Sequence, residues 1–456
     1  MASSAGSTDP RILIDDNLMS VRQWIVVALM VALNALDGFD VLSSAFAAPG
    51  ILVEWGLERP ELGVMLSAEL VGMGFGSVIL GGVADKIGRK PTMLMCLVIM
   101  AAGMFLASMA QSLWPLTGWR FLTGIGIGGM LAATNAVTAE STSRAGRSIA
   151  MALYVIGYPI GAVVGGLVAS NWLMLEYDWR AVFLFGAIVT AVLIPVVMLL
   201  VPETPAFLVA VRPDGAFERT NRSLRALNQP TIEAMPPFVE KKNRPKVTDI
   251  LSKPNLRKVT LLLAFGYAFH TITFYYILKW APTIVAGLGY TGAQAGNSLV
   301  AANIGGAIGG ALFGLVMQKW DIKKPAIIML ILGSIAVAAF GIMKETIWDW
   351  YFSTFMCGFL TNSAIVGFYS AFARGFPAHA RATGAGFVLG VGRAGAAGSP
   401  VIAGFLFGWL GDDELLTVSI IMALGSLVAA YLLLIMPLRD ADRDAAEAAA
   451  KLAEAP

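Results

Sequence analysis

Long apolar segments separated by short polar connections run along the whole chain of 456 residues. Twelve of these segments are long enough to cross a hydrocarbon core of about 30 Å as a helix. Only helices and closed barrels satisfy their backbone hydrogen bonds inside a bilayer, and the sequence lacks the alternating segments typical of barrel strands. The pattern therefore predicts an all-α membrane protein. Its spans are expected at 21–46, 61–82, 91–111, 115–141, 147–170, 180–201, 258–286, 293–317, 325–343, 348–373, 381–409 and 414–437.

A polar connection at about 202–257, rich in Pro, Arg and Lys, separates the sixth span from the seventh. It divides the chain into an N-terminal six-helix half (1–201) and a C-terminal six-helix half (258–437), followed by a tail (438–456). We expect the connection itself to be a central cytoplasmic loop. Six plus six spans suggest two pseudo-symmetric halves around a site near the bilayer midplane.

Composition agrees with a protein embedded in lipid. The chain is 57% hydrophobic and 14% charged, whereas a soluble domain carries about a quarter charged residues. Its mean hydropathy is +0.73. Cys96 and Cys357 lie in apolar runs, so we interpret them as buried thiols rather than as a disulfide or metal ligands. The formal net charge of +2 gives no reason to expect a nucleic-acid partner.

The distribution of Lys and Arg predicts the orientation of the chain. Of the 32 such residues, three lie in connections on one side of the predicted bilayer and three lie inside spans. These six are Arg59, Arg180 and Lys344 in the connections, and Arg120, Lys279 and Arg393 in the spans. Because the others lie in the termini and in the connections of the opposite side, we expect a multi-pass protein of the inner (plasma) membrane with both termini cytoplasmic. The N-terminus lacks the basic region of a cleavable signal, so the first span is expected to be retained.

Two stretches at equivalent places in the halves share a pattern: "GGVADKIGRKP" follows the second span and "GLVMQKWDIKKP" follows the eighth. The first resembles the loop signature of the major facilitator superfamily, with Gly81, Asp85, Gly88, Arg89 and Lys90 in register. The resemblance implies a conformational latch at Gly81, Asp85, Gly88 and Arg89. In this latch Gly88 permits a tight turn, and Asp85 caps a helix end and pairs with basic groups.

Three further motifs resemble signatures of that superfamily in the correct order. They are "RFLTGIGIGG" (120–129) in the fourth span, "GYPIGAVVGG" (157–166) in the fifth and "PETPAFL" (202–208) after the sixth. With them the resemblance covers nearly the whole chain and implies the major facilitator fold. The second-half loop departs from the pattern, because Gln318 and Lys319 stand where an acidic residue is expected.

Within the superfamily, "LDGFD" (36–40) resembles the DGxD signature of the aromatic acid:proton symporters. "LKWAPTIVAGLGYT" (278–291) and "RATGAGFVLGVGRAGAAGSP" (381–400) are similar to the seventh and eleventh spans of that family. Lys279 is a departure, since a small polar residue is expected there. The resemblance implies transport of an aromatic carboxylate together with protons.

Asp37 and Asp40 are three residues apart, so their carboxylates share one face of the first span. Either the span ends early and the pair caps it in water, or the pair lies inside the membrane. The apolar run "VLSSAFAAPGIL" (41–52) continues beyond them and favours the second interpretation. Two close carboxylates are costly to ionise together in a poorly hydrated site, which is typical of a proton site. We therefore predict that the pair carries the coupling proton, with no other cofactor.

Glu69 and Arg120 extend this predicted proton-coupling group. Glu69, in the second span, either joins the proton relay, neutralises a nearby cation or forms an interhelical hydrogen bond as a neutral acid. Arg120, near the outer start of the fourth span, either reaches the headgroups or pairs with a carboxylate of the first span. The glycines that follow Arg120 favour the ion pair, facing the transport cavity.

The second half supplies the predicted anion site. Arg393 lies near mid-depth of the eleventh span and its planar fork suits a carboxylate, so we predict it as the main substrate anchor. Lys279 is either a second cation for the anion or a lysine that reaches the outer interface. His270 either contacts substrate or is a packed hydrogen-bond donor. The other predicted substrate contacts are polar or aromatic residues at membrane depth: Tyr275, Tyr276, Trp280, Asn303, Asn362 and Tyr369.

These features together predict a secondary transporter that imports an organic anion together with protons. The anion that they favour is an aromatic carboxylate. The alternatives are a carrier of sugars or non-aromatic acids and an exporter on the same fold, because "PETPAFL" and the loop signature also suit sugar porters. A non-transporting sensor is disfavoured by the short tail. An enzyme is disfavoured because the sequence contains no Walker loop, His/Cys metal cluster or nucleophile elbow. The expected partners are the anion, protons and the bilayer, and the expected state is a monomer.

Overall fold

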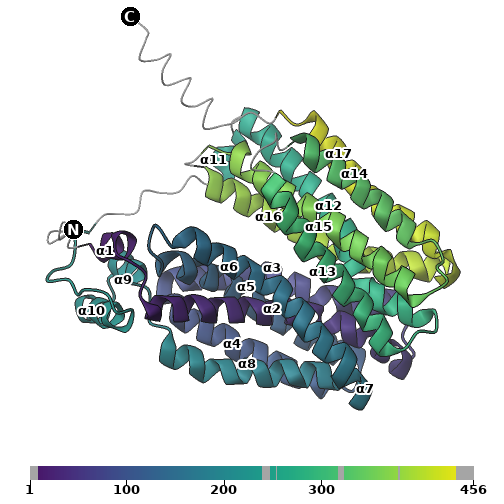
Figure 1. Ribbon diagram of the computed structural model, residues 1–456, viewed down its shortest axis with the longest axis horizontal. Helices are drawn as coiled ribbons and strands as arrows, with labels where there is room; N and C mark the ends of the chain where they lie inside the picture. Colours follow the sequence, from purple (N-terminus) through teal and green to yellow (C-terminus); the bar gives the residue numbers. More distant parts are fainter. Residues whose placement is uncertain (1–8, 239–246, 253, 317–322, 378–379, 438–456) are drawn as a thin grey trace, which may run out of the picture. The chain divides into compact units, whose positions relative to one another are not determined.

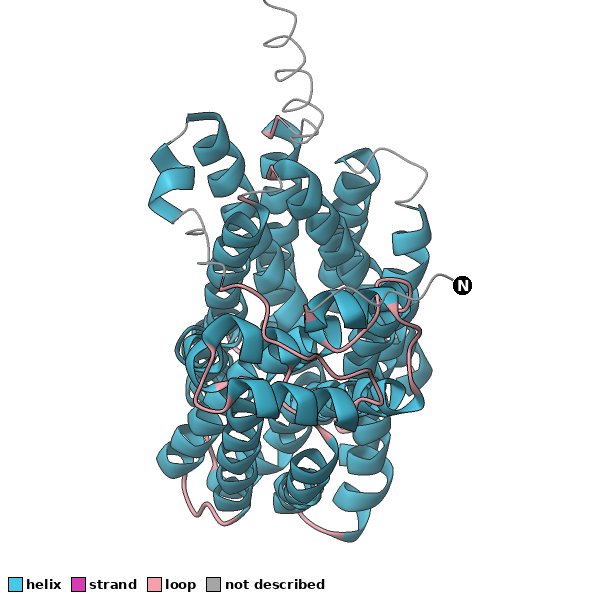
Figure 2. Cartoon of the chain, turned by 90° about the vertical axis from the view of Figure 1, so that its left-hand side faces the viewer, coloured by secondary structure: helices cyan, strands magenta, loops and turns pink. Residues whose placement is uncertain are grey.

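The computed structural model describes residues 9–238, 247–252, 254–316, 323–377 and 380–437 (Figure 1). The described parts of the chain are helices joined by short loops, without strands (Figure 2). Gln318, Lys319 and the predicted tail (438–456) lie outside the described residues.

Twelve of the described helices are long and apolar enough to cross a membrane, which confirms the predicted all-α fold with twelve spans. They are α2 (Val21–Trp55), α3 (Arg59–Ile87), α4 (Arg89–Ser108), α5 (Leu113–Glu140), α6 (Arg147–Val168), α8 (Arg180–Leu200), α12 (Pro254–Gly287), α13 (Gly292–Val316), α14 (Lys323–Phe340), α15 (Ile347–Gly375), α16 (Arg381–Leu410) and α17 (Leu415–Ile435). The shorter elements are α1 (Pro10–Asp16), η1 (Ala169–Leu173), α7 (Met174–Glu176), α9 (Pro205–Val211), α10 (Ala216–Ala226), α11 (Val247–Ser252) and η2 (Asp412–Glu414).

The first span is longer than its apolar pattern predicts. Helix α2 continues through Pro49 to Trp55, nine residues beyond the predicted end at 46. Asp37 and Asp40 therefore lie in the interior of a continuous helix. The structure thus excludes the interpretation in which the pair caps a short span in water.

The chain folds into two compact units. The first unit comprises Met1–Ser43, Ala68–Val168 and Glu176–Lys242, and the second comprises Ser44–Ser67, Ala169–Leu175 and Asn243–Pro456. These units differ from the predicted halves, because the segments 44–67 and 169–175 belong with the C-terminal helices.

Close packing explains why the start of α3 belongs to the second unit. A Cβ atom on Gly63 would lie 2.5 Å from the carbonyl oxygen of Pro400, and one on Gly404 would lie 2.7 Å from that of Arg59. Arg59 also pairs with Asp412 at 2.8 Å and lies over the ring of Trp280. Helix α3 therefore joins α16 at one end, while its remaining turns belong to the first unit.

In the first unit, α4 packs against both α5 and α8, and α5 packs against α6. Figure 1 shows α4 and α8 lying side by side. Helices α3 and α5 meet along glycines: a Cβ atom on Gly72 would lie 2.2 Å from the carbonyl oxygen of Phe121, and one on Gly124 would lie 2.1 Å from that of Glu69. These glycines provide close helix packing.

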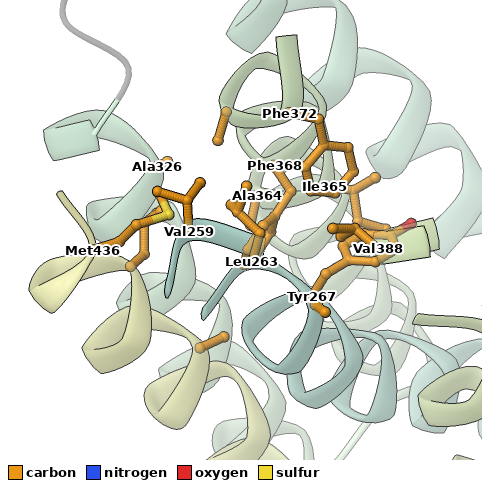
Figure 3. Close-up of a cluster of buried hydrophobic side chains, with 14 of the residues drawn as sticks. Val259, Leu263, Tyr267, Ala326, Ala364, Ile365, Phe368, Phe372, Val388 and Met436 are labelled. Carbon is orange, nitrogen blue, oxygen red and sulfur yellow. The ribbon is translucent and has the colours of Figure 1, made fainter. Parts of the chain in front are cut away.

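In the second unit, α13 packs on α15, α12 on α16 and α14 on α17. A cluster of buried hydrophobic side chains lies among these helices (Figure 3). It includes Val259, Leu263 and Tyr267 of α12 together with Phe368 and Phe372 of α15. This core holds the helices that carry the predicted anion site.

Candidate functional site

Two carboxylates lie fully buried on one face of α2, in the first unit. Asp37 and Asp40 are both completely inaccessible to solvent. None of their four carboxylate oxygens has a hydrogen-bond partner among the described residues. An ionised carboxylate in such a setting is far more costly to bury than a neutral acid. The site is therefore suited to holding at least one proton.

Side chains of α4 and α6 lie near Asp37. The side chains of Cys96 on α4 and Tyr154 on α6 lie within electrostatic range of its carboxylate. The Tyr154 hydroxyl lies 3.0 Å from the Thr134 hydroxyl on α5. Gly38 permits this arrangement, because a Cβ atom there would lie 2.1 Å from the carbonyl oxygen of Tyr158. Helix α6 thus approaches α2 closely at Gly38.

Arg120 forms its ion pair with Glu69, and both side chains are fully buried. The guanidinium also donates to the backbone carbonyl of Asp40 at 2.8 Å and lies over the ring of Phe183. The structure thus pairs Arg120 with Glu69, whereas the sequence analysis favoured a carboxylate of the first span. The glycine contacts between α3 and α5 explain the difference, because they bring Glu69 next to Arg120. Glu69 neutralises a cation, one of the roles considered for it.

The residues of the predicted latch gather where α3 passes into α4. Arg89 pairs with Asp85 and with Glu140, each at 3.1 Å. Gly88 has φ of 113°, a conformation that favours glycine, and a Cβ atom there would lie 2.1 Å from the carboxylate of Glu203. Gly81 lies on α3, where a Cβ atom would lie 3.8 Å from that of Ala132 on α5, an ordinary contact distance.

Glu203 and Glu140 complete this network, although the sequence analysis did not single them out. Glu203 accepts hydrogen bonds from the backbone N–H groups of Arg89 at 3.0 Å and Lys90 at 3.2 Å. Burial raises the pKa of Glu203, while these donors and the Arg89 charge oppose that rise. Glu140 accepts from the Thr204 hydroxyl at 2.6 Å. Glu203 and Thr204 both belong to the motif "PETPAFL". That motif therefore contained a sequence signal for this part of the network.

Arg393 lies on α16 in the second unit and is half-buried. It lies within electrostatic range of the Tyr267 phenol, as does Tyr275. Helices α12 and α16 are in close contact here, because a Cβ atom on Gly395 would lie 2.2 Å from the carbonyl oxygen of Ala268. The structure thus places Arg393 near Tyr267 of α12.

Lys279 is fully buried, so in this structure it does not extend to the surface of the protein as an interfacial lysine would. Its neighbours on α12 make defined contacts inside the unit. The Tyr276 hydroxyl lies 2.9 Å from the Ser419 hydroxyl, and the Trp280 indole donates to the carbonyl oxygen of Pro400 at 3.2 Å. These two aromatic residues connect α12 with α17 and α16.

His270 is also fully buried, and both ring nitrogens have protein partners. Nδ1 lies 2.9 Å from the Ser426 hydroxyl, and Nε2 lies 2.9 Å from the carbonyl oxygen of Thr361. In this structure His270 therefore connects α12, α15 and α17. This geometry matches the packed-donor alternative for His270.

Asn303 and Asn362 donate to backbone carbonyls of α13. Nδ2 of Asn303 donates to Leu299 at 2.8 Å, and Nδ2 of Asn362 donates to Gly306 at 2.7 Å. Asn362 thereby connects α15 to α13. Tyr369 differs from these two asparagines in its exposure, because about half of this residue is accessible to solvent.

Among the described residues, no group of three His, Cys, Asp or Glu side chains is placed to hold a metal ion. Cys96 and Cys357 are buried and form no disulfide, in agreement with their interpretation as apolar core residues.

The family model of the Major Facilitator Superfamily matches residues 27–400, and a second match covers 263–455. The second match begins near the start of the C-terminal half, as expected for a chain built from two repeated halves.

Curated relatives resemble the chain over most of its length. A gallate transporter of Pseudomonas putida is 27% identical over 404 residues, covering 86% of this chain and 87% of the relative. A 4-hydroxybenzoate transporter of the same organism is 27% identical over 394 residues, with the same coverage of 86% and 87%. A 3-(3-hydroxy-phenyl)propionate transporter of Escherichia coli is 25% identical over 392 residues, covering 84% of this chain and 87% of the relative.

A solved structure shares the fold. The crystal structure of a bacterial homolog of the human lysosomal transporter Spinster, in an inward-facing and occupied conformation, superimposes with a TM-score of 0.72. It covers 92% of this chain and 97% of its own, at 13% sequence identity.

Proposed function

The chain belongs to the Major Facilitator Superfamily, and from this premise we propose that it imports an aromatic carboxylate together with protons by alternating access. Its family and its twelve apolar helices identify it as a multi-pass membrane transporter rather than an enzyme. The observation that carries the proposal is the buried pair Asp37 and Asp40, whose carboxylate oxygens have no hydrogen-bond partner among the described residues.

The substrate class is supported by the relatives and by the second unit. The relatives named above transport gallate, 4-hydroxybenzoate and a hydroxyphenylpropionate, all of which are aromatic carboxylates. In this chain Arg393 supplies a half-buried guanidinium near Tyr267 of α12. A guanidinium binds a carboxylate through two parallel hydrogen bonds, and aromatic rings provide an apolar surface for the substrate ring.

Proton coupling is supported by the setting of Asp37 and Asp40. Among the described residues, the carboxylate oxygens of both aspartates have no hydrogen-bond partner, and the nearby Arg120 forms an ion pair with Glu69. A carboxyl group in this position loads a proton when water reaches it from the acidic side. It releases the proton when the transporter opens to the other side. Glu69 and Arg120 contribute to this proton site by setting the charge beside Asp40.

The distribution of Lys and Arg supports insertion in the inner (plasma) membrane with both termini in the cytoplasm. In that orientation the latch formed by Gly81, Asp85, Gly88 and Arg89 lies at the cytoplasmic end of the first unit. We include in this proposal a monomeric transporter in which the latch regulates opening toward the cytoplasm.

The test is uptake by proteoliposomes that contain the purified full-length chain. Labelled 4-hydroxybenzoate, benzoate and glucose are compared under an imposed pH gradient, alkaline inside, with protein-free liposomes subtracted. We expect protein-dependent accumulation of at least one aromatic acid and none of glucose. Glucose uptake without uptake of any aromatic acid would contradict the proposed substrate class.

A further inference from the structure

Two phenol hydroxyl groups meet inside the second unit, one from α12 and one from α15. The hydroxyl oxygens of Tyr267 and Tyr369 lie 3.4 Å apart, and the ring centroids lie 6.1 Å apart with an interplanar angle of 46°. Only 7% of Tyr267 is exposed, whereas 49% of Tyr369 is exposed. The pair therefore combines a buried tyrosine with one that solvent reaches.

Packing fixes the position of Tyr267. The rings of Phe368 and Phe372 meet it edge to face, with centroid distances of 5.5 Å and 5.4 Å. On α16, a Cβ atom on Gly392 would lie 2.2 Å from Cδ1 of Tyr267, so the absence of a side chain there makes room for the ring. Figure 3 shows Tyr267 at the edge of the buried cluster away from Met436. The Tyr267 hydroxyl is thus held in place before any ligand arrives.

The same contact brings the predicted anion anchor near the phenols. Arg393 directly follows Gly392, and its charge lies within electrostatic range of the Tyr267 phenol. The Thr271 hydroxyl holds the two helices together here by donating to the carbonyl oxygen of Gly392 at 2.9 Å. One cation and two hydroxyl groups are therefore gathered on three helices of a single unit.

The two hydroxyl groups retain hydrogen-bonding capacity. Each phenol is one donor and one acceptor, and a separation of 3.4 Å is long for a hydrogen bond between hydroxyl groups, which is normally about 2.7–2.8 Å. A third hydroxyl group that bridges them would make shorter bonds to both. A bare aromatic C–H at the same place would make neither bond.

We propose that Tyr267 and Tyr369 recognise a ring hydroxyl of the substrate, so that the transporter prefers hydroxylated aromatic carboxylates to unsubstituted ones. This inference rests on the proposed function, with Arg393 holding the carboxylate. Tyr369, the more exposed member, contacts the ligand hydroxyl directly, and Tyr267 supplies the fixed second partner. Discrimination arises because a site built for a hydroxyl group leaves polar groups without partners when the ligand lacks one.

A purely structural role for the pair makes a different prediction. If the hydroxyl groups only hold α12 to α15, removing one of them weakens binding of every ligand equally or lowers stability. If the tyrosine hydroxyl groups recognise a ring hydroxyl of the ligand, removing one tyrosine hydroxyl weakens binding of hydroxylated acids alone. The ratio of two dissociation constants separates these cases, because damage to the fold affects both constants together.

The experiment measures binding of benzoate, 3-hydroxybenzoate and 4-hydroxybenzoate to the purified full-length chain. The variants are Tyr369→Phe and Tyr267→Phe, each of which removes one oxygen and keeps the ring. The matched control is Tyr431→Phe on α17, where the tyrosine is exposed. We expect the wild type to bind at least one hydroxybenzoate about three- to tenfold more tightly than benzoate. Tyr369→Phe should reduce this preference to less than about twofold with benzoate binding unchanged, and Tyr431→Phe should preserve it.

The inference is overturned if the wild type binds all three acids equally, if Tyr369→Phe keeps the preference, or if that variant weakens binding of all three alike. Should Tyr267→Phe fail to fold, Tyr369→Phe alone decides, because its side chain lies at the exposed edge. Failure of the proposed function gives a different result, since a folded wild-type chain would then bind none of the three acids.

Discussion

Arg393 and Lys279 are both cations on helices of the second unit, but their settings differ. Lys279 is fully buried, whereas Arg393 is half-buried beside Tyr267. A ligand therefore reaches Arg393 more readily, and the planar fork of a guanidinium matches a carboxylate in a way that an ammonium group does not. This contrast supports Arg393 as the residue that anchors the substrate.

The variant Arg393→Lys tests this assignment because it keeps the charge and removes the fork. We expect binding of 4-hydroxybenzoate to weaken by about tenfold, the cost of roughly one strong hydrogen bond. The matched control is Arg257→Lys, an exposed arginine near the start of α12. Titration calorimetry of both variants provides the measurement. Equal affinity in Arg393→Lys and wild type would assign the anchor to another residue.

Several residue-level predictions depended on which side chains meet in space, which a single sequence leaves open. The sequence placed Asp37, Asp40, Glu69 and Arg120 among apolar residues, and all four are fully buried. The structure pairs Arg120 with Glu69, whereas a first-span carboxylate was expected. This pairing depends on how closely α3 approaches α5. That approach is determined by Gly72 and Gly124 acting together on both helices.

At the scale of helices, the contact between α3 and α5 makes a sharp prediction. A Cβ atom on Gly72 would lie 2.2 Å from the carbonyl oxygen of Phe121, whereas one on Gly74 would meet nothing within 4 Å. We expect Gly72→Ala to destabilise the protein by about 1–3 kcal/mol, since the helices must move apart. Gly74→Ala should be neutral or slightly stabilising, because alanine favours a helix.

Thermal unfolding of the two variants in the same detergent is the measurement. Both substitutions add one methyl group to α3 two residues apart, so differences in hydrophobicity and expression largely cancel. A Gly72→Ala variant that unfolds at the same temperature as Gly74→Ala would mean that α3 and α5 do not pack as closely as described.

Apolar length predicted the existence of every span but placed some boundaries imperfectly. Helix α2 extends to Trp55, because Pro49 is tolerated within it. The latch shows a similar limit. Its motif identified Gly88 and Arg89, yet the carboxylate that accepts hydrogen bonds from Arg89 and Lys90 comes from Glu203, far along the chain. Pairings between distant segments need the fold.

At the scale of the whole molecule, the two-half pattern predicted the fold class and the family, because repeated apolar segments and ordered signatures extend along the entire chain. It did not predict that 44–67 and 169–175 would pack with the C-terminal helices. Those assignments depend on contacts such as Gly63 against Pro400 and Arg59 with Asp412. Such contacts form only when distant segments meet.

Proton coupling through the buried aspartates is the central claim of this account. An amide at position 40 preserves size and cannot cycle a proton, so Asp40→Asn separates coupling from substrate binding. Two rates are measured in the same proteoliposomes: accumulation of a labelled aromatic acid under a pH gradient, and exchange of labelled for unlabelled acid without a gradient. Protein-free liposomes provide the background for passive entry of the acid.

The most direct test is therefore the ratio of gradient-driven accumulation to exchange in wild type and in Asp40→Asn. We predict that wild type accumulates the acid above the passive level. In Asp40→Asn, accumulation should fall by at least about tenfold while exchange persists, because binding and conformational change remain. Accumulation at the wild-type level in Asp40→Asn, with exchange also unchanged, would contradict a coupling role for this carboxylate.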